Sequence, residues 1–161
     1  MVTVTDIWHW LEEVSDPEVP VLSVVDLGVV RSVNLIGNSA EIVITPTYSG
    51  CPAMRVIEED IRAKLAEHGI NDLVVTTTLS PAWTTDWLSE NGRRKLKEYG
   101  IAPPENEVDK SVLFSAPTVV PCPICNSRNT KMVSQFGSTA CKAHYQCNDC
   151  LEPFDYFKCL K

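Results

Sequence analysis

Four cysteines near the C-terminal end have the spacing of a metal site. They form two Cys-x2-Cys pairs, Cys122 with Cys125 and Cys147 with Cys150, and 21 residues separate the two pairs. Each pair can place two thiolates on one ion, and two pairs complete the tetrahedron that structural zinc prefers. The spacing predicts a small β-rich zinc ribbon over residues 118–161. Four thiolates also suit a rubredoxin-like iron site or an iron-sulfur cluster, so iron is the alternative metal.

Two further cysteines, Cys141 and Cys159, lie in the same part of the chain. Each is predicted to be a small apolar filler. The alternative is a redox group or, for Cys141, another metal ligand in the pattern Cys141-x2-His144-x2-Cys147. A ribbon of about 40 residues buries little core, so we expect metal binding to supply much of its folding free energy.

The seventh cysteine, Cys51, lies in the segment 45–52, which joins an expected strand to an expected helix. The positive end of the helix dipole and its free N–H groups should lower the pKa of a thiol at that position. The resulting thiolate could attack electrophiles or bind a soft metal. The alternative is an N-capping or buried cysteine. Asp16 and Glu18, on either side of Pro17, are likewise either turn and capping residues or chemical groups.

Hydrophobic periodicity predicts the elements that must position these residues. The expected elements are a helix over 6–14 behind Asp6 as its N-cap, strands over 29–36 and 40–45, a helix from Pro52 to Gly69, a strand over 73–79 and a helix over 84–99. The order α-β-β-α-β-α predicts a compact α+β sandwich over residues 1–100. The Pro-, Gly- and Glu-containing segment 101–117 is predicted to be a linker.

Aromatic residues are prominent in two places. The aromatic segment 153–157 is expected to cover the metal site. Short strands are expected over 130–136 and 140–146, joined by a turn at Gly137-Ser138. Trp83 and Trp87 lie four positions apart among Ser, Pro, Thr and Asp residues. They are either core residues or an exposed anchor for a partner protein, because aromatic residues dominate interface hot spots.

Charge is unevenly distributed along the sequence. Residues 1–100 carry 15 acidic and 8 basic side chains and residues 101–161 carry 6 of each, so the net charge of -7 lies in the first part. A phosphate backbone would be repelled, and we expect no nucleic-acid partner. No stretch approaches the roughly 20 apolar residues that span a bilayer, so no membrane is expected. The first residues lack the features of a secretory signal, and two Cys-x2-Cys pairs among seven cysteines favour metal ligation in a reducing cytoplasm.

Several motifs resemble a known family. Asp16-Pro-Glu18, Asp26-Leu-Gly28 and Thr45-x-Thr47-x3-Cys51-Pro52 resemble the signature of the MIP-type iron-sulfur assembly domain over about residues 5–100. The likeness extends along the chain to the D subunits of the bacterial phenylacetyl-CoA ring 1,2-epoxidase. The segments that carry it are 80–87, 100–104, 136–142 and 152–159.

The resemblance implies an accessory protein without catalytic activity of its own, which helps to mature metal centres in aerobic phenylacetate degradation. Cys51 would be a transient ligand for iron or an iron-sulfur cluster. The residues implied to organise or hold its loop are Asp16, Glu18, Asp26, Thr45 and Thr47. The implied partners are the other epoxidase subunits, especially the iron-sulfur flavin reductase. Because each chain offers one thiolate here, a bound cluster would be shared across a homodimer or with the recipient.

With the resemblance taken into account, three functions remain open. The first is this assembly factor, the second is a non-catalytic structural subunit of the oxygenase, and the third is an electron carrier with iron in the ribbon. A diiron oxygenase is not expected, because none of His9, His68 and His144 stands in a Glu-x2-His pattern. A thiol-redox enzyme is not favoured either, because two Cys-x2-Cys pairs at this spacing would share a metal ion.

Overall fold

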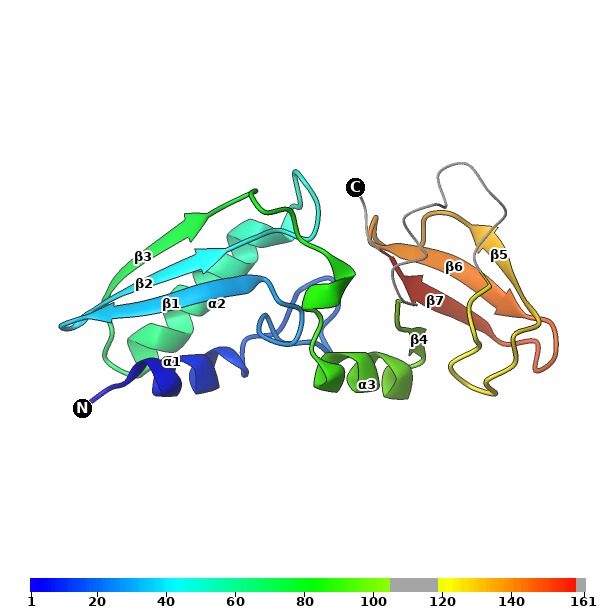
Figure 1. Cartoon of the computed structure of the whole chain (residues 1–161), viewed down its shortest axis with the longest axis horizontal. Coiled ribbons are helices and arrows are strands. Elements are labelled where there is room, and N and C mark those ends of the chain that lie inside the picture. The colour runs from blue at the N-terminus through cyan, green and yellow to red at the C-terminus, as the bar shows by residue number, and fades with distance from the viewer. Residues whose placement is uncertain (105–118, 159–161) are drawn as a thin grey trace. The chain divides into compact units, whose positions relative to one another are not determined.

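The computed structural model describes residues 1–104 and 119–158 and divides into two compact units, Met1–Gly92 and Arg93–Lys161. The described residues form helices and two separate sheets, one of three strands and one of four (Figure 1). The α+β class predicted from the sequence is therefore confirmed. No helix in these residues has the length and apolar character needed to cross a bilayer.

Helix α1, Val4–Leu11, begins earlier than predicted. Its N-cap is Thr3, whose hydroxyl accepts the Asp6 amide at 3.2 Å, while the Asp6 carboxylate accepts the Thr3 amide at 2.8 Å. The prediction of Asp6 as the N-cap was wrong by one turn. Asp6 instead completes a capping box, in which two otherwise unpaired N–H groups at the start of the helix are satisfied reciprocally.

The first sheet has the order β1-β2-β3, with β1 at Val30–Ile36, β2 at Ser39–Ile44 and β3 at Asp72–Thr77. Strand β2 pairs antiparallel with β1 and parallel with β3, and helix α2, Ala53–Glu67, makes the connection between β2 and β3. The core residues Ile42, Ile44, Ile57, Ile61 and Leu65 are at most 1% exposed. Alternation along β2 and helical spacing along α2 thus bury one face of each element. This βαβ connection places Cys51 between a strand end and a helix start.

The helix predicted over 84–99 is interrupted. A 3-10 turn η1 at Thr85–Trp87 is followed by helix α3 at Glu90–Tyr99. Between them, the Ser89 amide donates to the Asp26 carbonyl at 2.9 Å, and the Ser89 hydroxyl donates to the Asp26 carboxylate at 3.0 Å. The Ser89 hydroxyl also accepts the Gly92 amide at 2.9 Å, which starts α3 afresh. A tertiary contact therefore overrides the continuous helical pattern.

The second sheet has the order β4-β7-β6-β5. Its strands are β4 at Ile101–Ala102, β5 at Thr130–Ser134, β6 at Lys142–Cys147 and β7 at Pro153–Phe157. Tyr145, Phe154 and Tyr156 pack together in its core with Val120 and Cys122. Two residues assigned to the linker, Ile101 and Ala102, pair with β7. Residues 105–117 of that linker lie outside the described residues, and the domain boundaries stay a prediction.

Candidate functional site

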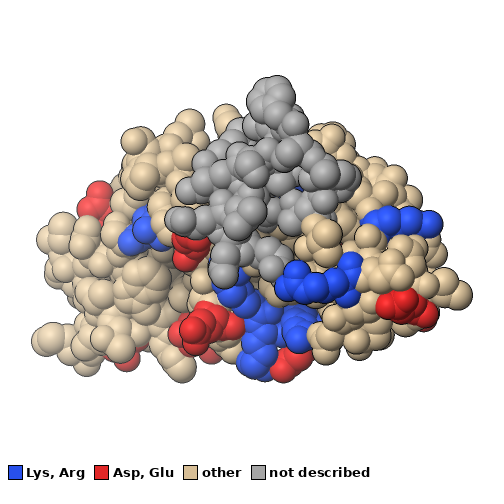
Figure 2. All heavy atoms as spheres, turned by 45° about the vertical axis from the view of Figure 1, so that its right-hand side comes forward, with Lys and Arg blue, Asp and Glu red and all other residues tan. Residues whose placement is uncertain are grey.

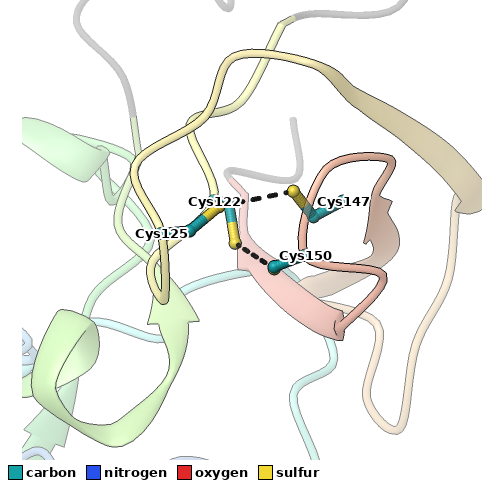
Figure 3. Close-up of side chains that lie close together, drawn as sticks. All are labelled: Cys122, Cys125, Cys147 and Cys150. Carbon is teal, nitrogen blue, oxygen red and sulfur yellow. Dashed lines mark hydrogen bonds between the residues drawn. The ribbon is translucent and has the colours of Figure 1, made fainter.

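The four cysteines of the two Cys-x2-Cys pairs converge on one point, as predicted (Figure 3). Their sulfur atoms all lie within 4.8 Å of one another. The Sγ atoms of Cys122 and Cys150 are 3.7 Å apart, and those of Cys125 and Cys147 are 3.5 Å apart. A tetrahedral ion with metal–sulfur bonds of about 2.3 Å requires sulfur–sulfur separations of about 3.8 Å. The donor atoms and their spacing fit one tetrahedral metal ion, so this is a metal site.

Both turns of the metal site are built in the same way. The residue after the second cysteine of each pair has a left-handed backbone, with φ 61° at Asn126 and 64° at Leu151. Such a residue reverses the chain and brings backbone N–H groups toward the sulfurs. The amide of Cys150 has the largest influence on the Cys147 thiol and lowers its pKa to about 7. Amide donors therefore favour the thiolate at Cys147, the form that a metal requires. Backbone amides are also the largest single influence at Cys125 and Cys150, but burial and the neighbouring sulfurs together outweigh them and raise the pKa of both thiols.

Polar side chains tie the two turns to each other. Asn129 donates to the Asp149 carboxylate at 2.9 Å, Ser127 also hydrogen-bonds to that carboxylate, and the Asn148 amide donates to the Asn129 carbonyl at 2.8 Å. The hydrogen bonds from Ser127 and Asn129 lower the pKa of Asp149. These hydrogen bonds join the turn of the first cysteine pair to the turn of the second.

The alternative ligand pattern Cys141-x2-His144-x2-Cys147 is not formed. Cys141 is 3% exposed and its sulfur lies 3.0 Å from the Thr139 hydroxyl, whereas the His144 ring lies 3.5 Å from the Asp155 carboxylate. Among the described residues, the group of three or more metal-binding side chains consists of the four paired cysteines alone. Cys141 is thus a buried side chain of the ribbon. Cys159 lies outside the described residues.

Cys51 lies where the sequence predicts it, between the end of β2 and the start of α2. The loop turns at Gly50, which has a φ of 77° that favours glycine, and the Cys51 amide donates to the Tyr48 carbonyl at 3.3 Å. Pro52 then occupies the helix N-cap without a side-chain cap. The half-buried Cys51 thiol therefore lies beside the Ala53 amide at the start of α2, while the Met54 amide donates to the Cys51 carbonyl at 3.4 Å.

The predicted lowering of the Cys51 pKa is wrong. Burial is the largest influence and raises the pKa of this thiol; the Ala53 amide acts in the opposite direction, and the carboxylates of Glu18 and Asp16 raise the pKa further. Desolvation and like charge thus outweigh the helix terminus, because both disfavour a thiolate. The thiol is held in its protonated form until a cation or another charge change favours the thiolate.

Tyr48 belongs to this site, although the sequence analysis missed it. Its hydroxyl donates to the Glu18 carboxylate at 3.1 Å, and it is near enough to Cys51 to influence the pKa of that thiol. Burial, the Cys51 thiol and the Glu18 carboxylate all raise the pKa of Tyr48, so the hydroxyl keeps its proton. An aromatic hydroxyl three residues before the cysteine, in a turn otherwise made of small residues, was the available signal.

Asp16 is a turn residue that also serves the site. Its Oδ1 atom accepts the amides of Glu18 and Val19, each at 2.8 Å, and its side chain is buried. This hydrogen-bonded turn fixes the backbone of Glu18 beside the Cys51 loop. The turn role predicted for Asp16 is therefore confirmed, and its alternative as a chemical group of the site stays a prediction.

Asp26 connects other loops. Its carboxylate accepts the Ser89 hydroxyl at 3.0 Å, the Asn91 amide group at 3.3 Å and the Ser23 backbone amide at 3.4 Å. These bonds join the segment after α1 to the start of α3. Their geometry favours a structural role for Asp26, and its predicted role at the Cys51 loop stays a prediction.

Thr45 does not hold the loop as predicted. Its side chain is 1% exposed and its hydroxyl has no hydrogen-bond partner among the described residues, while its backbone amide donates to the Val29 carbonyl at 2.8 Å. The prediction that this hydroxyl bonds the backbone near Cys51 is therefore wrong. The role of Thr47, which is half-buried, stays a prediction.

The two tryptophans differ in exposure. Trp83 is 4% exposed, and its indole N–H donates to the Leu27 carbonyl at 2.8 Å. Of the two alternatives predicted for Trp83, the core residue is confirmed and the exposed anchor is wrong. Trp87 is half-buried, and the Arg31 guanidinium lies 3.5 Å from the centre of its ring. A partner contact at Trp87 stays a prediction.

The effect of the Glu18 carboxylate on the Cys51 thiol should be measurable as a change in the rate at which Cys51 is alkylated. A raised pKa means that alkylation by iodoacetamide reaches half its maximal rate at a higher pH than for an ordinary thiol. Glu18→Gln removes a like charge, so the thiolate forms at lower pH and alkylation at pH 8 becomes faster. The site of labelling is identified by peptide mass spectrometry. An unchanged or slower rate in Glu18→Gln would contradict this electrostatic account.

Comparison with known families covers both parts of the chain. Residues 5–75 match the family described as iron-sulfur cluster assembly protein, and residues 106–158 match the PaaD zinc beta ribbon domain. A crystal structure of a domain of unknown function, DUF59, from Bacillus anthracis superposes with a TM-score of 0.55 at 29% identity, covering 58% of this chain and 90% of that one. A conserved hypothetical protein from Thermotoga maritima gives a TM-score of 0.51 at 30% identity over 59% of this chain and 94% of that one.

Relatives with assigned names extend these matches. The chain is 35% identical over 97 residues, which are 58% of this chain and 90% of the relative, to a "Fe-S protein maturation auxiliary factor" of Porphyromonas gingivalis strain W83. It is 48% identical over 157 residues, which are 98% of this chain and 93% of the relative, to the Escherichia coli K12 protein named as the D subunit of a "Putative 1,2-phenylacetyl-CoA epoxidase". These relatives support a role in iron-sulfur assembly or maturation. The chain belongs to the family of 1,2-phenylacetyl-CoA epoxidase D subunits, in which an iron-sulfur cluster assembly domain is followed by a PaaD zinc ribbon.

Proposed function

We propose that this protein is an accessory subunit of the phenylacetyl-CoA epoxidase system that receives iron or an iron-sulfur cluster at Cys51 and passes it to another component. The observation that carries the proposal is the Cys51 loop, where one half-buried thiol lies at a helix start beside the Glu18 carboxylate and the Tyr48 hydroxyl. One protein thiolate holds its cargo less firmly than four do, which suits transfer.

The ribbon metal has a separate role in this proposal. Zinc is the proposed ion, because four thiolates at tetrahedral spacing form the closed shell of structural zinc sites. Bound zinc would supply folding free energy to the ribbon. Because four cysteines fill its coordination shell, the zinc would have no open position for a substrate. The ribbon then serves as a rigid docking module.

The charge distribution supports a protein partner. Residues 1–92 carry 14 acidic and 4 basic side chains, a net charge of -10, whereas residues 93–161 carry 7 acidic and 10 basic ones, a net charge of +3. On the face shown in Figure 2, the Lys and Arg side chains lie among Asp and Glu side chains. Such a surface suits an acidic or mixed protein surface better than a phosphate backbone. The proposed recipient is the iron-sulfur flavin reductase.

Replacing Cys51 tests the function directly. Cys51→Ala removes the only donor sulfur of the loop without touching the ribbon, so the protein should fold and keep its ribbon metal. The reductase purified from a strain that carries this variant is expected to lack most of its iron-sulfur cluster, measured as iron and sulfide per flavin and by its visible absorption.

The matched control is Cys141→Ala, which removes a buried thiol that is not a metal ligand. A strain with this control should yield a loaded reductase. If Cys51→Ala also yields a fully loaded reductase, the proposed function is wrong.

A further inference from the structure

The two cysteine pairs of the ribbon lie in two loops that are closed in the same way. The Cys122 amide donates to the Ser127 carbonyl at 2.9 Å, and the Cys147 amide donates to the Glu152 carbonyl at 3.0 Å. Each bond encloses both cysteines of one pair, so it restrains the two sulfurs of that pair within their own loop. A tetrahedral site also requires that the two loops keep a fixed position relative to each other.

Strand pairing fixes part of that relative position. Strands β5 and β6 pair from Thr130 and Cys147 onward, so the ladder ends at the first cysteine of the second pair. Cys125 and Cys150 lie outside the ladder, and Cys125 is exposed while Cys150 is half-buried. The ladder therefore does not restrain the outer cysteine of either pair.

The side chain of Asp149 connects the second loop to the first. Its Oδ1 atom accepts the Asn129 side-chain amide at 2.9 Å, and its Oδ2 atom accepts the Ser127 hydroxyl. The backbone and side-chain amides of Asn148 donate to the backbone and side-chain carbonyls of Asn129, at 2.8 Å and 3.0 Å. The Ser127 hydroxyl also accepts the Asn129 amide at 3.0 Å. These four residues form one hydrogen-bonded group beyond the end of the ladder, which we call the Asp149 clasp.

The charge of Asp149 acts against metal binding. Four thiolates around a divalent ion form a net anion, and a carboxylate close to that anion repels it. If the charge were the main influence of Asp149, its removal would tighten metal binding. If the hydrogen bonds of the clasp are the main influence, its removal weakens metal binding. The two effects have opposite signs, so one substitution distinguishes them.

We propose that Asp149 is a positioning residue of the metal site, which holds the two cysteine loops at the separation that a tetrahedral ion requires. It supplies no ligand atom and acts through Ser127 and Asn129. Loops that are held in position before the ion arrives lose less freedom when they bind it, and this favours binding. The inference goes beyond the function proposed for Cys51 and rests on the zinc ion proposed for the ribbon.

The first test is the zinc affinity of the full-length protein, measured by competition with a chromophoric chelator. Loss of a group that orients metal ligands weakens binding by about 10- to 100-fold, so Asp149→Ala should raise the dissociation constant for Zn²⁺ by about tenfold or more. Ser127→Ala should raise it as well, whereas Ser127→Thr keeps the hydroxyl and should bind zinc normally. Glu152→Ala removes an exposed carboxylate from the same loop and leaves the clasp in place, so it should not weaken binding.

Alkylation of the zinc-loaded protein separates positioning from general stability. Cys141 is 3% exposed and is not a ligand, so iodoacetamide reaches it when the ribbon opens as a whole. In Asp149→Ala, peptide mass spectrometry should show faster labelling of Cys125 and Cys150, while Cys141 stays protected. Equal acceleration at Cys141 would mean that Asp149 stabilises the whole ribbon, and the inference would be wrong.

The remaining outcomes also decide between the possibilities. Unchanged or tighter zinc binding by Asp149→Ala overturns the inference and leaves the proposed zinc ion unaffected. An unmodified protein that binds no zinc contradicts the proposed ion and the inference together. If Asp149→Ala yields no folded protein, the zinc affinity and the labelling pattern of Ser127→Ala, compared with those of Ser127→Thr, decide by the same criteria.

Discussion

Cys147→Ser is expected to release the ribbon metal and to unfold the sheet of the second unit. Cys147 ends strand β6, is fully buried and belongs to the same core as Tyr145 and Phe154. Structural zinc contributes about 10–16 kcal/mol of apparent binding free energy in small zinc domains. Loss of one ligand therefore removes more stabilising free energy than the small core of the ribbon can supply. Less than a tenth of the original metal should remain per chain, measured by elemental analysis.

The first unit provides an internal reference for this experiment. All four tryptophans, at positions 8, 10, 83 and 87, lie in Met1–Gly92. Tryptophan fluorescence should therefore stay native in Cys147→Ser, while the near-ultraviolet tyrosine signal and protease resistance of the ribbon are lost. Cys141→Ser is the matched control, because Cys141 is also buried in this unit but is not a ligand.

The same samples identify the metal. A colourless protein with one zinc per chain supports the structural role, whereas a red protein that dithionite bleaches indicates iron and an electron carrier. A Cys147→Ser protein that keeps its metal and its protease resistance would contradict the assignment of this cysteine as a ligand.

Gly28→Ala is expected to destabilise the first unit by about 2–5 kcal/mol. Gly28 has a φ of 75°, and an added Cβ would lie 2.5 Å from the carbonyl oxygen and 2.7 Å from the Cβ atom of Trp87. The left-handed backbone alone costs about 1–2 kcal/mol with a side chain, and the clash with backbone atoms adds about 1–3 kcal/mol. Urea unfolding followed by tryptophan fluorescence measures the change.

Gly37→Ala separates the two contributions. Gly37 also has a left-handed backbone, with φ 64°, but an added Cβ would meet no atom within 4 Å. This control should show only the backbone strain of about 1–2 kcal/mol. Equal losses of stability in the two variants would contradict the prediction, because they would mean that the contact with Trp87 adds no destabilisation to Gly28→Ala.

Much of the fold follows from local patterns in the sequence. Apolar spacing predicts α2 and its buried residues Ile57, Ile61 and Leu65, and it gives the strands β1, β2 and β3 to within one or two residues. The exceptions involve groups distant in sequence. Ser89 ends the 3-10 turn because it bonds to Asp26, 63 residues away, and no periodicity within 84–99 contains that contact.

The metal site of the ribbon and the Cys51 loop also differ in how far local sequence predicts them. The sequence by itself determined the ribbon ligands, because each Cys-x2-Cys pair is a local turn that already places two sulfurs on one ion. It also determined that Cys51 lies at a strand–helix junction. Only the tertiary structure decided the chemistry of that thiol, because its pKa depends on burial and on the carboxylates of Glu18 and Asp16. A helix dipole is a local property, whereas desolvation and like charge arise when distant segments pack around the thiol.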